Sequence, residues 1–378
     1  MKAQRLVEII GSDFYSGVPD SQLKPLCNYL MDYYGIDTRH HIIAANEGNC
    51  TALAAGYYLA TGRTAVVYMQ NSGEGNVINP VASLLNDKVY GIPVLFIIGW
   101  RGEPGIPDEP QHIFQGEVTL MLLEQMGISY FVIQKETSEE EVYMAMEKFR
   151  RQMQEGKQAA FVIRKGALTY EREQEYQNTY PLVREQVIER IAEEAGADLV
   201  ISTTGKASRE LYEIRERKEQ GHRCDFLTVG SMGHASSIAL GVAVNQPHQK
   251  VWCIDGDGAA IMHMGALAVI GASKPTNLIH IILNNEAHET VGGMPTVGSS
   301  IDFPGVARAC GYPYTVCVND MDALTRELHE ARRDQKLRLI EVKCAVGSRK
   351  DLGRPATAAK DNKKQFMDYI KEQEVRRQ

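Results

Sequence analysis

The sequence predicts an α/β protein made of two similar domains, each with a parallel β-sheet flanked by helices. Apolar runs of strand length alternate with helical patterns along most of the chain, which is typical of parallel sheets with helical crossovers. Turns rich in glycine and acidic residues follow several of these apolar runs, most clearly the GDG turn at 256–258. The two halves of the chain also match one another, which indicates two copies of one module.

The internal match is an offset of 185 residues, the distance from Gly56 to Gly241, and it needs no gap. In each half a helix rich in small residues comes first, and we expect it to end at the glycine of this pair. A strand, a glycine turn and a second strand follow, so that Val66 meets Val251, Gly73 meets Gly258 and Ile98 meets Leu283. Coincidence among short apolar strands is the alternative explanation.

The composition is that of a chain with room for two domains or slightly more. It has 378 residues, of which 44% are hydrophobic, so it can bury a large core. Its formal net charge is −7, whereas nucleic-acid binding relies on basic contacts, so we expect no nucleic-acid partner. The longest apolar runs, such as 92–100 and 278–283, are too short to cross a bilayer, and we expect no membrane partner.

The cysteines and the N-terminal residues indicate a cytoplasmic protein. The 7 cysteines form no CxxC pair, and several lie within apolar patterns, so we interpret them as core residues in a reducing compartment. Their spacing also argues against an iron–sulfur oxidoreductase, which needs clustered thiolates. The N-terminal residues do not resemble a signal peptide, because Glu8 interrupts a short amphipathic stretch and no small-residue cleavage site follows.

The first half begins as alternating helices and strands. We expect a helix at 6–10, a strand and turn at 13–20, a helix at 22–34, and a strand from residue 41 that leads into a small-residue helix at 50–60. Asp20 suits the role of a helix cap. Glu47 precedes the last helix, where it is either an acid favoured by the helix dipole or a carboxylate shielded from solvent between strand and helix.

A long polar segment follows the predicted strand at 94–98. Residues 99–116 contain several prolines and show no helical period, so we expect a loop of the kind that often forms lids or binding surfaces. Arg101, His112 and Gln115 are its polar candidates. For each of them, a solvated connection without a functional role is the alternative.

A charged segment separates the two halves. Before it we expect a helix, a strand, a helix at 139–154 and a strand at 159–163. Residues 169–184 lack core periodicity and contain a proline, so we place the domain boundary there. The predicted division is an N-terminal domain at 1–168, a linker at 169–184 and a C-terminal domain at 185–378.

The second half contains two turns that suit a bound ligand. The first follows the predicted strand at 198–202, where free backbone N–H groups at the start of a helix would face a phosphate, with Thr204 and Lys206 beside them. The second, at 230–234, leads into another small-residue helix. Near the C-terminus, a basic segment at 347–355 is either solvated or directed towards an anionic substrate.

The stretch at 256–290 carries the clearest chemistry. Asp257 follows one apolar strand at 251–254, and Asn285 follows the next at 278–283. The carboxyl ends of neighbouring parallel strands form one crevice, so both side chains face it. A carboxylate and an amide are hard oxygen donors that suit Mg²⁺ or Ca²⁺ bound together with phosphate groups. Taken singly, each turn would be an ordinary one.

This stretch resembles the cofactor motif of thiamine diphosphate (ThDP) enzymes, in which GDG is followed, after a helix and a strand, by NN. The matching residues are Gly256, Asp257 and Gly258, followed by Asn284 and Asn285. The resemblance implies that Mg²⁺ is bound by the side chains of Asp257 and Asn285 and by the backbone carbonyl of Ala287. It also implies two sheets, one for the pyrimidine ring and one for the diphosphate.

The same resemblance assigns the other cofactor contacts. Glu47 is implied as the glutamate that activates the aminopyrimidine ring by exchanging a proton with it. Met232 is implied as the apolar residue that wedges between the two rings of the cofactor. The implied cofactor-binding set is Glu47, Thr204, Gly205, Gly230, Met232, Gly256, Asp257, Gly258, Ala259, Asn285, Ala287 and Thr290.

In function the chain resembles ThDP-dependent 2-oxo acid decarboxylases, although the central domain of the larger ones has no room here. The matching segments are 16–20, 45–49, 108–112 and 348–355. The resemblance implies decarboxylation of a small anionic 2-oxo acid that carries a phosphonate or, alternatively, a sulfonate. The implied catalytic residues are Glu47, with Asp20 and His112 as alternative proton donors. The residues expected near the substrate are Arg101, Gln115, Lys206, Arg349 and Arg354.

Neither half has a complete site by itself. The first half has Ser72 where the second has Asp257, and the second half has no match to Glu47. In the proteins that this chain resembles the cofactor spans two chains, so we expect a homodimer or larger assembly with active sites at the subunit interface. A non-catalytic ThDP-binding partner protein is the alternative from another class; loss of the glutamate would favour it, but Glu47 is present.

Overall fold

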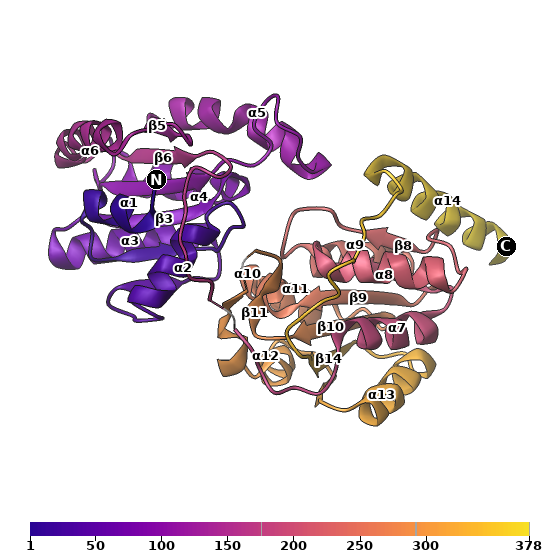
Figure 1. Cartoon of the computed structure of the whole chain (residues 1–378). Coiled ribbons are helices and arrows are strands. Elements are labelled where there is room, and N and C mark those ends of the chain that lie inside the picture. The colour runs from indigo at the N-terminus through magenta and orange to yellow at the C-terminus, as the bar shows by residue number, and fades with distance from the viewer. Residues whose placement is uncertain (175, 292, 378) are drawn as a thin grey trace. The chain divides into compact units, whose positions relative to one another are not determined.

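Two six-stranded parallel sheets organise the chain, as the sequence predicts (Figure 1). The computed structural model describes residues 1–174, 176–291 and 293–377. Unit 1 comprises Met1–Glu175 with Val291–Met294, and unit 2 comprises Tyr176–Thr290 with Pro295–Gln378. In this division the residues from Tyr176 to Arg184, part of the predicted linker, belong to unit 2.

Unit 1 alternates strands and helices from its first residues. Its elements are α1 (Ala3–Ile10), β1 (Tyr15–Gly17), α2 (Lys24–Tyr33), β2 (His41–Ile43), α3 (Glu47–Thr61), β3 (Ala65–Gln70), η1 (Asn71–Gly73), α4 (Glu74–Pro80), η2 (Val81–Leu85), β4 (Val94–Gly99), α5 (Pro110–Gln125), β5 (Ser129–Ile133), α6 (Glu139–Gln154) and β6 (Ala159–Ile163). The predicted bounds of α6 and β6 are confirmed. Helix α6 starts where it does because Ser138 and Glu141 form a capping box.

Unit 2 repeats the alternation and ends in a long helix. Its large elements are α7 (Arg184–Ala195), β7 (Leu199–Ser202), α8 (Lys206–Arg217), β8 (Asp225–Leu227), α9 (Ala235–Asn245), β9 (Val251–Gly256), α10 (Asp257–Met262), α11 (Gly265–Ser273), β10 (Leu278–Asn284), α12 (Phe303–Ala309), β13 (Tyr314–Val318), α13 (Met321–Arg333), β14 (Arg338–Lys343) and α14 (Ala359–Arg377). Short elements follow β10, namely β11 (Ala287–His288), η3 (Glu289–Val291), β12 (Met294–Pro295) and η4 (Val297–Ser300).

The two sheets have the same topology, which confirms the predicted duplication. The strand order is β2-β1-β3-β4-β6-β5 in unit 1 and, read in the same direction, β8-β7-β9-β10-β14-β13 in unit 2. In both, the order reverses next to the first strand of the unit, between β1 and β3 and between β7 and β9. Such a reversal opens a crevice at the carboxyl ends of the strands, where α/β sheets bind ligands.

Helices cover both faces of each sheet. In unit 1 the apolar side chains of α1, α2 and α6 pack with one face of the central strands, and α3 contacts β1, β3 and β4. In unit 2, α7, α8 and α13 pack with one face, and α9 contacts β7, β9 and β10. Both sheets are therefore buried on two sides, which explains the nearly continuous apolar runs in their strands. Among the described residues, no helix combines the length and apolar character needed to span a membrane.

Three expectations about the elements were wrong in detail. Gly56 and Gly241 lie inside α3 and α9 and do not end them. The segment at 99–116 is a loop only as far as Glu109, because α5 begins at Pro110, and proline is well suited to the first position of a helix. The helix expected after Asp257 is divided into α10 and α11.

Candidate active site

In unit 1, three predicted polar residues and one further residue, Asn71, follow four neighbouring strands at their carboxyl ends. Asp20 comes after β1, Glu47 begins α3 after β2, Asn71 follows β3, and Arg101 follows β4. These strands are adjacent in the order β2-β1-β3-β4. The sheet therefore directs all four turns to one edge, at the crevice defined by the reversal of strand order.

Glu47 is held at this edge as a buried carboxylate. It is the first residue of α3, behind Asn46, whose side chain caps the helix by accepting a hydrogen bond from the Asn49 N–H. Only 5% of Glu47 is exposed. Asn76 Nδ2 donates to Glu47 Oε2 at 2.6 Å. One carboxylate oxygen thus has a fixed partner within the domain, and the side chain has a defined orientation.

Asp20 is completely buried and accepts hydrogen bonds at both of its carboxyl oxygens. Its Oδ2 accepts hydrogen bonds from the N–H groups of Gln22 and Leu23, so it caps the turn before α2, and Gln70 Nε2 donates to its Oδ1 at 2.6 Å. Burial raises the pKa of Asp20, and these hydrogen bonds oppose the rise only in part. A β-carbon at Gly99 would lie 2.2 Å from Asp20 Oδ2, so glycine is required there for space.

The three polar candidates of the predicted loop have different surroundings. Arg101 forms a two-point ion pair with Asp108, which, together with two backbone N–H groups, lowers the pKa of Asp108 despite its partial burial. Gln115, on α5, donates to the carbonyl of Asn71 at 3.1 Å. His112, also on α5, is buried, and burial lowers its pKa to about 4. The imidazole is therefore neutral at pH 7.

Glu74 is a buried acid that the sequence did not single out. It is the first residue of α4, two positions after Ser72, and none of its surface is exposed. Burial raises its pKa to about 8, so the folded chain holds this carboxyl group neutral at pH 7. Unit 1 therefore does carry an acid near the turn after β3, but one that is uncharged and unsuited to Mg²⁺.

In unit 2, the implied cofactor residues also follow four adjacent strands. Thr204 and Gly205 come after β7, the turn at 230–234 after β8, Asp257 after β9, and Asn285 after β10. The strands are neighbours in the order β8-β7-β9-β10. The structure thus brings together the cofactor residues predicted for this domain, at one edge of one sheet.

The predicted metal ligands lie at the centre of this edge and suit a hard cation. Asp257 begins α10 and is 2% exposed; burial raises its pKa to about 6, and a hydrogen bond from Thr296 Oγ1 opposes that rise. Asn285 Oδ1 lies within hydrogen-bonding distance of the Ala287 N–H, at 3.2 Å. A carboxylate, an amide oxygen and a backbone carbonyl on two short loops form a donor set that fits Mg²⁺ beside a diphosphate.

The amide of Asn285 is oriented by a buried ion cluster. Its Nδ2 donates to Glu289 Oε2 at 2.9 Å, which leaves Oδ1 on the other side of the amide. Arg184 and Lys206 both donate to Glu289 and, against the effect of burial, lower its pKa to about 2. Arg184 also makes a two-point ion pair with Glu210. Lys206, predicted near the substrate, therefore has Glu289 as a partner in the same domain.

The remaining cofactor candidates surround Gly258. A β-carbon built there would be 3.4 Å from Met232 Cε and 3.2 Å from the His288 ring, so Met232 lies directly beside the GDG turn. The hydroxyl of Thr204 donates to the carbonyl of Val229 at 2.9 Å, which ties the turn after β7 to the one after β8. The side chain of Thr290 lies outside the described residues.

The basic C-terminal segment is attached to unit 2 by ion pairs. Arg349 contacts Glu185, Glu213 and Asp351. Arg354 also has an interaction partner. The role of both arginines near a substrate stays a prediction.

A buried group of possible ligand side chains lies elsewhere in the same sheet. The donor atoms of Cys253, Asp255 and His280 are all within 4.8 Å of one another. His280 Nε2 is 3.5 Å from Asp255 Oδ2, a distance that suits an acid–imidazole ion pair. We therefore interpret this group as a buried polar pair beside a core thiol.

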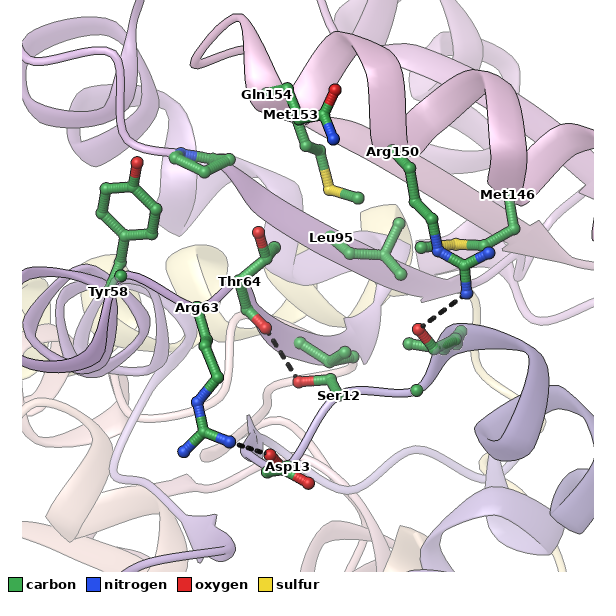
Figure 2. A pocket seen from close by; sticks show the side chains of 15 residues that line it. Ser12, Asp13, Tyr58, Arg63, Thr64, Leu95, Met146, Arg150, Met153 and Gln154 are labelled. Atoms are coloured by element: carbon green, nitrogen blue, oxygen red, sulfur yellow. Dashed lines mark hydrogen bonds and ion pairs between the residues drawn. The ribbon is translucent and has the colours of Figure 1, made fainter.

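A cavity in unit 1 lies at the opposite ends of the strands (Figure 2). It has a volume of about 500 Å³, and its lining includes Thr64 and Pro93, which precede β3 and β4. Both of its arginines have partners: Arg63 pairs with Asp13, as Figure 2 shows. Arg150 pairs with Glu147 and donates to the carbonyl of Ile9. The cavity is at the amino ends of the strands, away from the turns that carry the predicted site.

Comparison with known proteins identifies the class. The family model of the thiamine pyrophosphate enzyme N-terminal TPP binding domain matches residues 3–123, and that of the C-terminal TPP binding domain matches residues 203–342. The chain therefore belongs to the thiamine pyrophosphate enzymes, and thiamine diphosphate, the same compound, is its cofactor. The matched ranges include Glu47, Asp257 and Asn285, whereas Arg349 and Arg354 lie beyond them.

Relatives of known activity extend over nearly the whole chain. A phosphonopyruvate decarboxylase of Streptomyces hygroscopicus is 36% identical over 96% of this chain and 92% of its own. One from Streptomyces viridochromogenes is 33% identical with the same coverage. A sulfopyruvate decarboxylase of Methanosarcina acetivorans is 28% identical over 90% of both chains.

Proposed function

We propose that this protein is a ThDP- and Mg²⁺-dependent decarboxylase that converts 3-phosphonopyruvate into phosphonoacetaldehyde and CO₂, a carbon–carbon lyase reaction of phosphonate biosynthesis. The observation that carries the proposal is that each sheet holds one part of the site at the carboxyl ends of its strands: buried Glu47 in unit 1, and Asp257 and Asn285 in unit 2. The chain is also similar over 96% of its length to phosphonopyruvate decarboxylases. Decarboxylation of sulfopyruvate is the second candidate, supported by a relative of lower identity over 90% of the chain.

The cofactor, when bound, supplies the electron sink that allows CO₂ to leave a 2-oxo acid. The chain's own residues bind it and move protons. Asp257, Asn285 and the carbonyl of Ala287 would hold Mg²⁺, and the backbone at 256–259 would face the diphosphate. Glu47, held by Asn76, would exchange a proton with the aminopyrimidine ring.

Two residues compete for the second proton transfer, to the carbon that CO₂ leaves. Asp20 has a pKa raised by burial, which favours the protonated form that can donate in such a step. His112 has a pKa of about 4 and offers only a neutral imidazole at pH 7. We therefore propose Asp20 as the donor and His112 as a hydrogen-bonding residue. Arg101 and Gln115 are the candidates for substrate contacts in the same domain.

We further propose a homodimer or larger assembly in the cytoplasm. Each active site would combine Glu47 of one chain with Asp257, Asn285 and Met232 of another. The two units support this arrangement because each lacks what the other has. The first residue of α9 is Ala235, in the place that Glu47 has in α3, and no acid directly follows β3. The five buried cysteines suit a reducing compartment.

A substrate comparison tests the proposal. The purified protein is supplied with Mg²⁺ and ThDP and assayed with phosphonopyruvate, sulfopyruvate, pyruvate and benzoylformate. We expect the highest kcat/KM with phosphonopyruvate and release of phosphonoacetaldehyde. A higher kcat/KM with sulfopyruvate would replace the first candidate by the second. Tight cofactor binding without turnover of any of the four would instead support a non-catalytic partner protein.

A further inference from the structure

The loop that carries two of the proposed metal ligands contains a residue in an unfavourable backbone conformation. Glu286 lies between Asn285 and Ala287, and its φ of 62° places it in the left-handed region. Residues with a side chain rarely adopt this conformation, and glycine is the usual choice. Something outside the loop must therefore hold the backbone at Glu286, since the directions of the Asn285 and Ala287 oxygens depend on it.

The side chain of Glu286 is held at both of its oxygens. Tyr176 OH donates to Oε2 at 2.7 Å, and Tyr180 OH donates to Oε1. Glu286 is buried, and its carboxylate has a phenolic partner on each oxygen. Burial and the hydrogen bond to Glu286 raise the pKa of both tyrosines to about 12, so both hydroxyls keep the protons that they donate.

A third residue of the same segment holds the loop backbone. Asn178 Nδ2 donates to the carbonyl of Asn285 at 2.9 Å and to the carbonyl of Cys344 at 3.0 Å. Tyr176, Asn178 and Tyr180 alternate along the chain, as expected for an extended segment with one face on the loop. We call the segment from Tyr176 to Tyr180 the strap.

The strap is itself anchored to the sheet. Leu182 pairs with Cys344 in a parallel bridge, and the Ala345 N–H donates to the carbonyl of Leu182 at 2.7 Å. The Cys344 N–H donates to the carbonyl of Asn284, at the end of β10, at 2.9 Å. The metal loop is thus connected through the strap to the end of β14, the strand beside β10.

We propose that the strap positions the metal loop, and that Tyr176, Asn178, Tyr180 and Glu286 set the affinity for Mg²⁺ without touching it. This inference rests on the proposed metal ligands Asp257, Asn285 and Ala287. Mutating residues that orient metal ligands commonly lowers metal affinity by about 10- to 100-fold. The strap lies in the segment of chain that joins the two units. That segment would therefore also tune cofactor binding.

The first experiment removes the two hydroxyls. The variants Tyr176→Phe and Tyr180→Phe, and the double variant, are titrated with Mg²⁺ at fixed ThDP by calorimetry. We expect the Kd for Mg²⁺ to rise about tenfold or more in the double variant, with kcat little changed once Mg²⁺ and ThDP are saturating. Tyr314→Phe is the matched control, because its hydroxyl donates to Glu327 at 2.8 Å in the same unit, away from the metal loop.

The second experiment separates the backbone conformation from the lost contacts. Glu286→Ala and Glu286→Gly both remove the carboxylate, but only glycine adopts the left-handed conformation at no steric cost. We expect the alanine variant to lose Mg²⁺ affinity and the glycine variant to retain most of it. A role in general stability alone would lower the melting temperature of both variants and leave the Kd unchanged.

These outcomes separate the strap from the metal site itself. Unchanged Mg²⁺ affinity in the double tyrosine variant, with binding lost in Asp257→Ala, would overturn the role of the strap and leave the metal site intact. Unchanged Mg²⁺ binding in Asp257→Ala would overturn the metal site and the strap's role with it.

Discussion

The carboxylate of Glu47 lies against the backbone of Gly73. A β-carbon built on Gly73 would be 2.5 Å from Glu47 Cγ and 2.6 Å from its Oε1, closer than any side chain permits. The backbone of Gly73 is ordinary, with a φ of −76°, so glycine is needed there for space and not for its conformational freedom. The glycine turn after β3 thus supplies one wall of the place that Glu47 occupies.

Gly73→Ala should therefore displace Glu47 and reduce turnover. A misplacement of about 1 Å costs roughly a hundredfold in rate, and we expect a loss of that order in kcat. Gly75→Ala is the matched control, because a β-carbon at Gly75 would have no neighbouring atom within 4 Å and kcat should stay near the parental value. Steady-state kinetics with saturating cofactor measures both. Parental activity in Gly73→Ala would show that Glu47 can move without consequence.

Glu47→Gln should separate cofactor binding from turnover. The amide keeps the shape of the side chain but cannot exchange a proton, so we expect kcat to fall by about 10²–10⁴-fold. Calorimetry with ThDP and Mg²⁺ should give a Kd close to that of the parent. If turnover is unaffected, the activating group lies elsewhere.

Asp257→Ala should abolish Mg²⁺-dependent binding of ThDP. The variant removes the anionic ligand from a buried site, and the two remaining neutral oxygens cannot replace its charge. Calorimetry should detect no binding at concentrations that saturate the parent. Asp322→Ala, which removes an exposed acid on α13 of the same unit, should bind normally. Equal affinities for all three proteins would contradict the assignment.

Mixing Glu47→Gln with Asp257→Ala should restore activity if the active site is shared between chains. After dissociation and reassembly of equal amounts, about half of the dimers are hybrid, and each hybrid has one intact site of two. About a quarter of the parental activity should return. Native mass spectrometry verifies the exchange of subunits. Confirmed exchange without activity would exclude a shared site.

Glu74→Gln should become relatively more stabilising as pH rises. Burial raises the pKa of Glu74 from 4.5 to about 8, so the folded chain keeps a proton that the unfolded chain loses first. The stability of the parent therefore falls between these two values, whereas glutamine is neutral throughout. Between pH 5.5 and 8.5 we expect the free energy of unfolding of the variant, relative to that of the parent, to rise by about 3 kcal/mol, measured by urea unfolding.

The exposed Glu117 on α5 provides the control for this experiment, since Glu117→Gln should change stability equally at both pH values. The same gain in Glu74→Gln at pH 5.5 and at pH 8.5 would mean that Glu74 is ionised in the folded protein.

The sequence is most informative where local patterns and tertiary structure agree. The pattern at 139–154 predicts α6 with its observed bounds, where the structure then shows a capping box at Ser138, and apolar runs predict β6, β9 and β10. The order of the turns along the chain, together with the parallel sheet, is enough to place Asp257 and Asn285 at one edge. The start of α5 is harder to predict, because Pro110 is the last of several prolines typical of a loop, although proline also suits the first helical position.

The supporting residues of the site cannot be predicted in the same way. Glu289 and Thr296 hold Asn285 and Asp257 through contacts that depend on the path of an irregular segment after β10, which has no period to interpret. Glu74 looks like an ordinary acid in a helical first turn until its burial is known. The strap lies within the charged linker, yet the alternation of Tyr176, Asn178 and Tyr180 is a visible sign of an extended segment with one functional face.

Each sheet is built from one continuous part of the chain, which has a consequence for biosynthesis. Every strand of the first sheet lies between Tyr15 and Ile163, and in the part of the chain that the structure describes no strand of one sheet pairs with a strand of the other. The first sheet can therefore form on the ribosome before the second half has been translated, as N-terminal domains generally do. By the time the second half emerges, the nascent chain would present one finished sheet, and the segment Val291–Met294, which belongs to unit 1, would join that unit later.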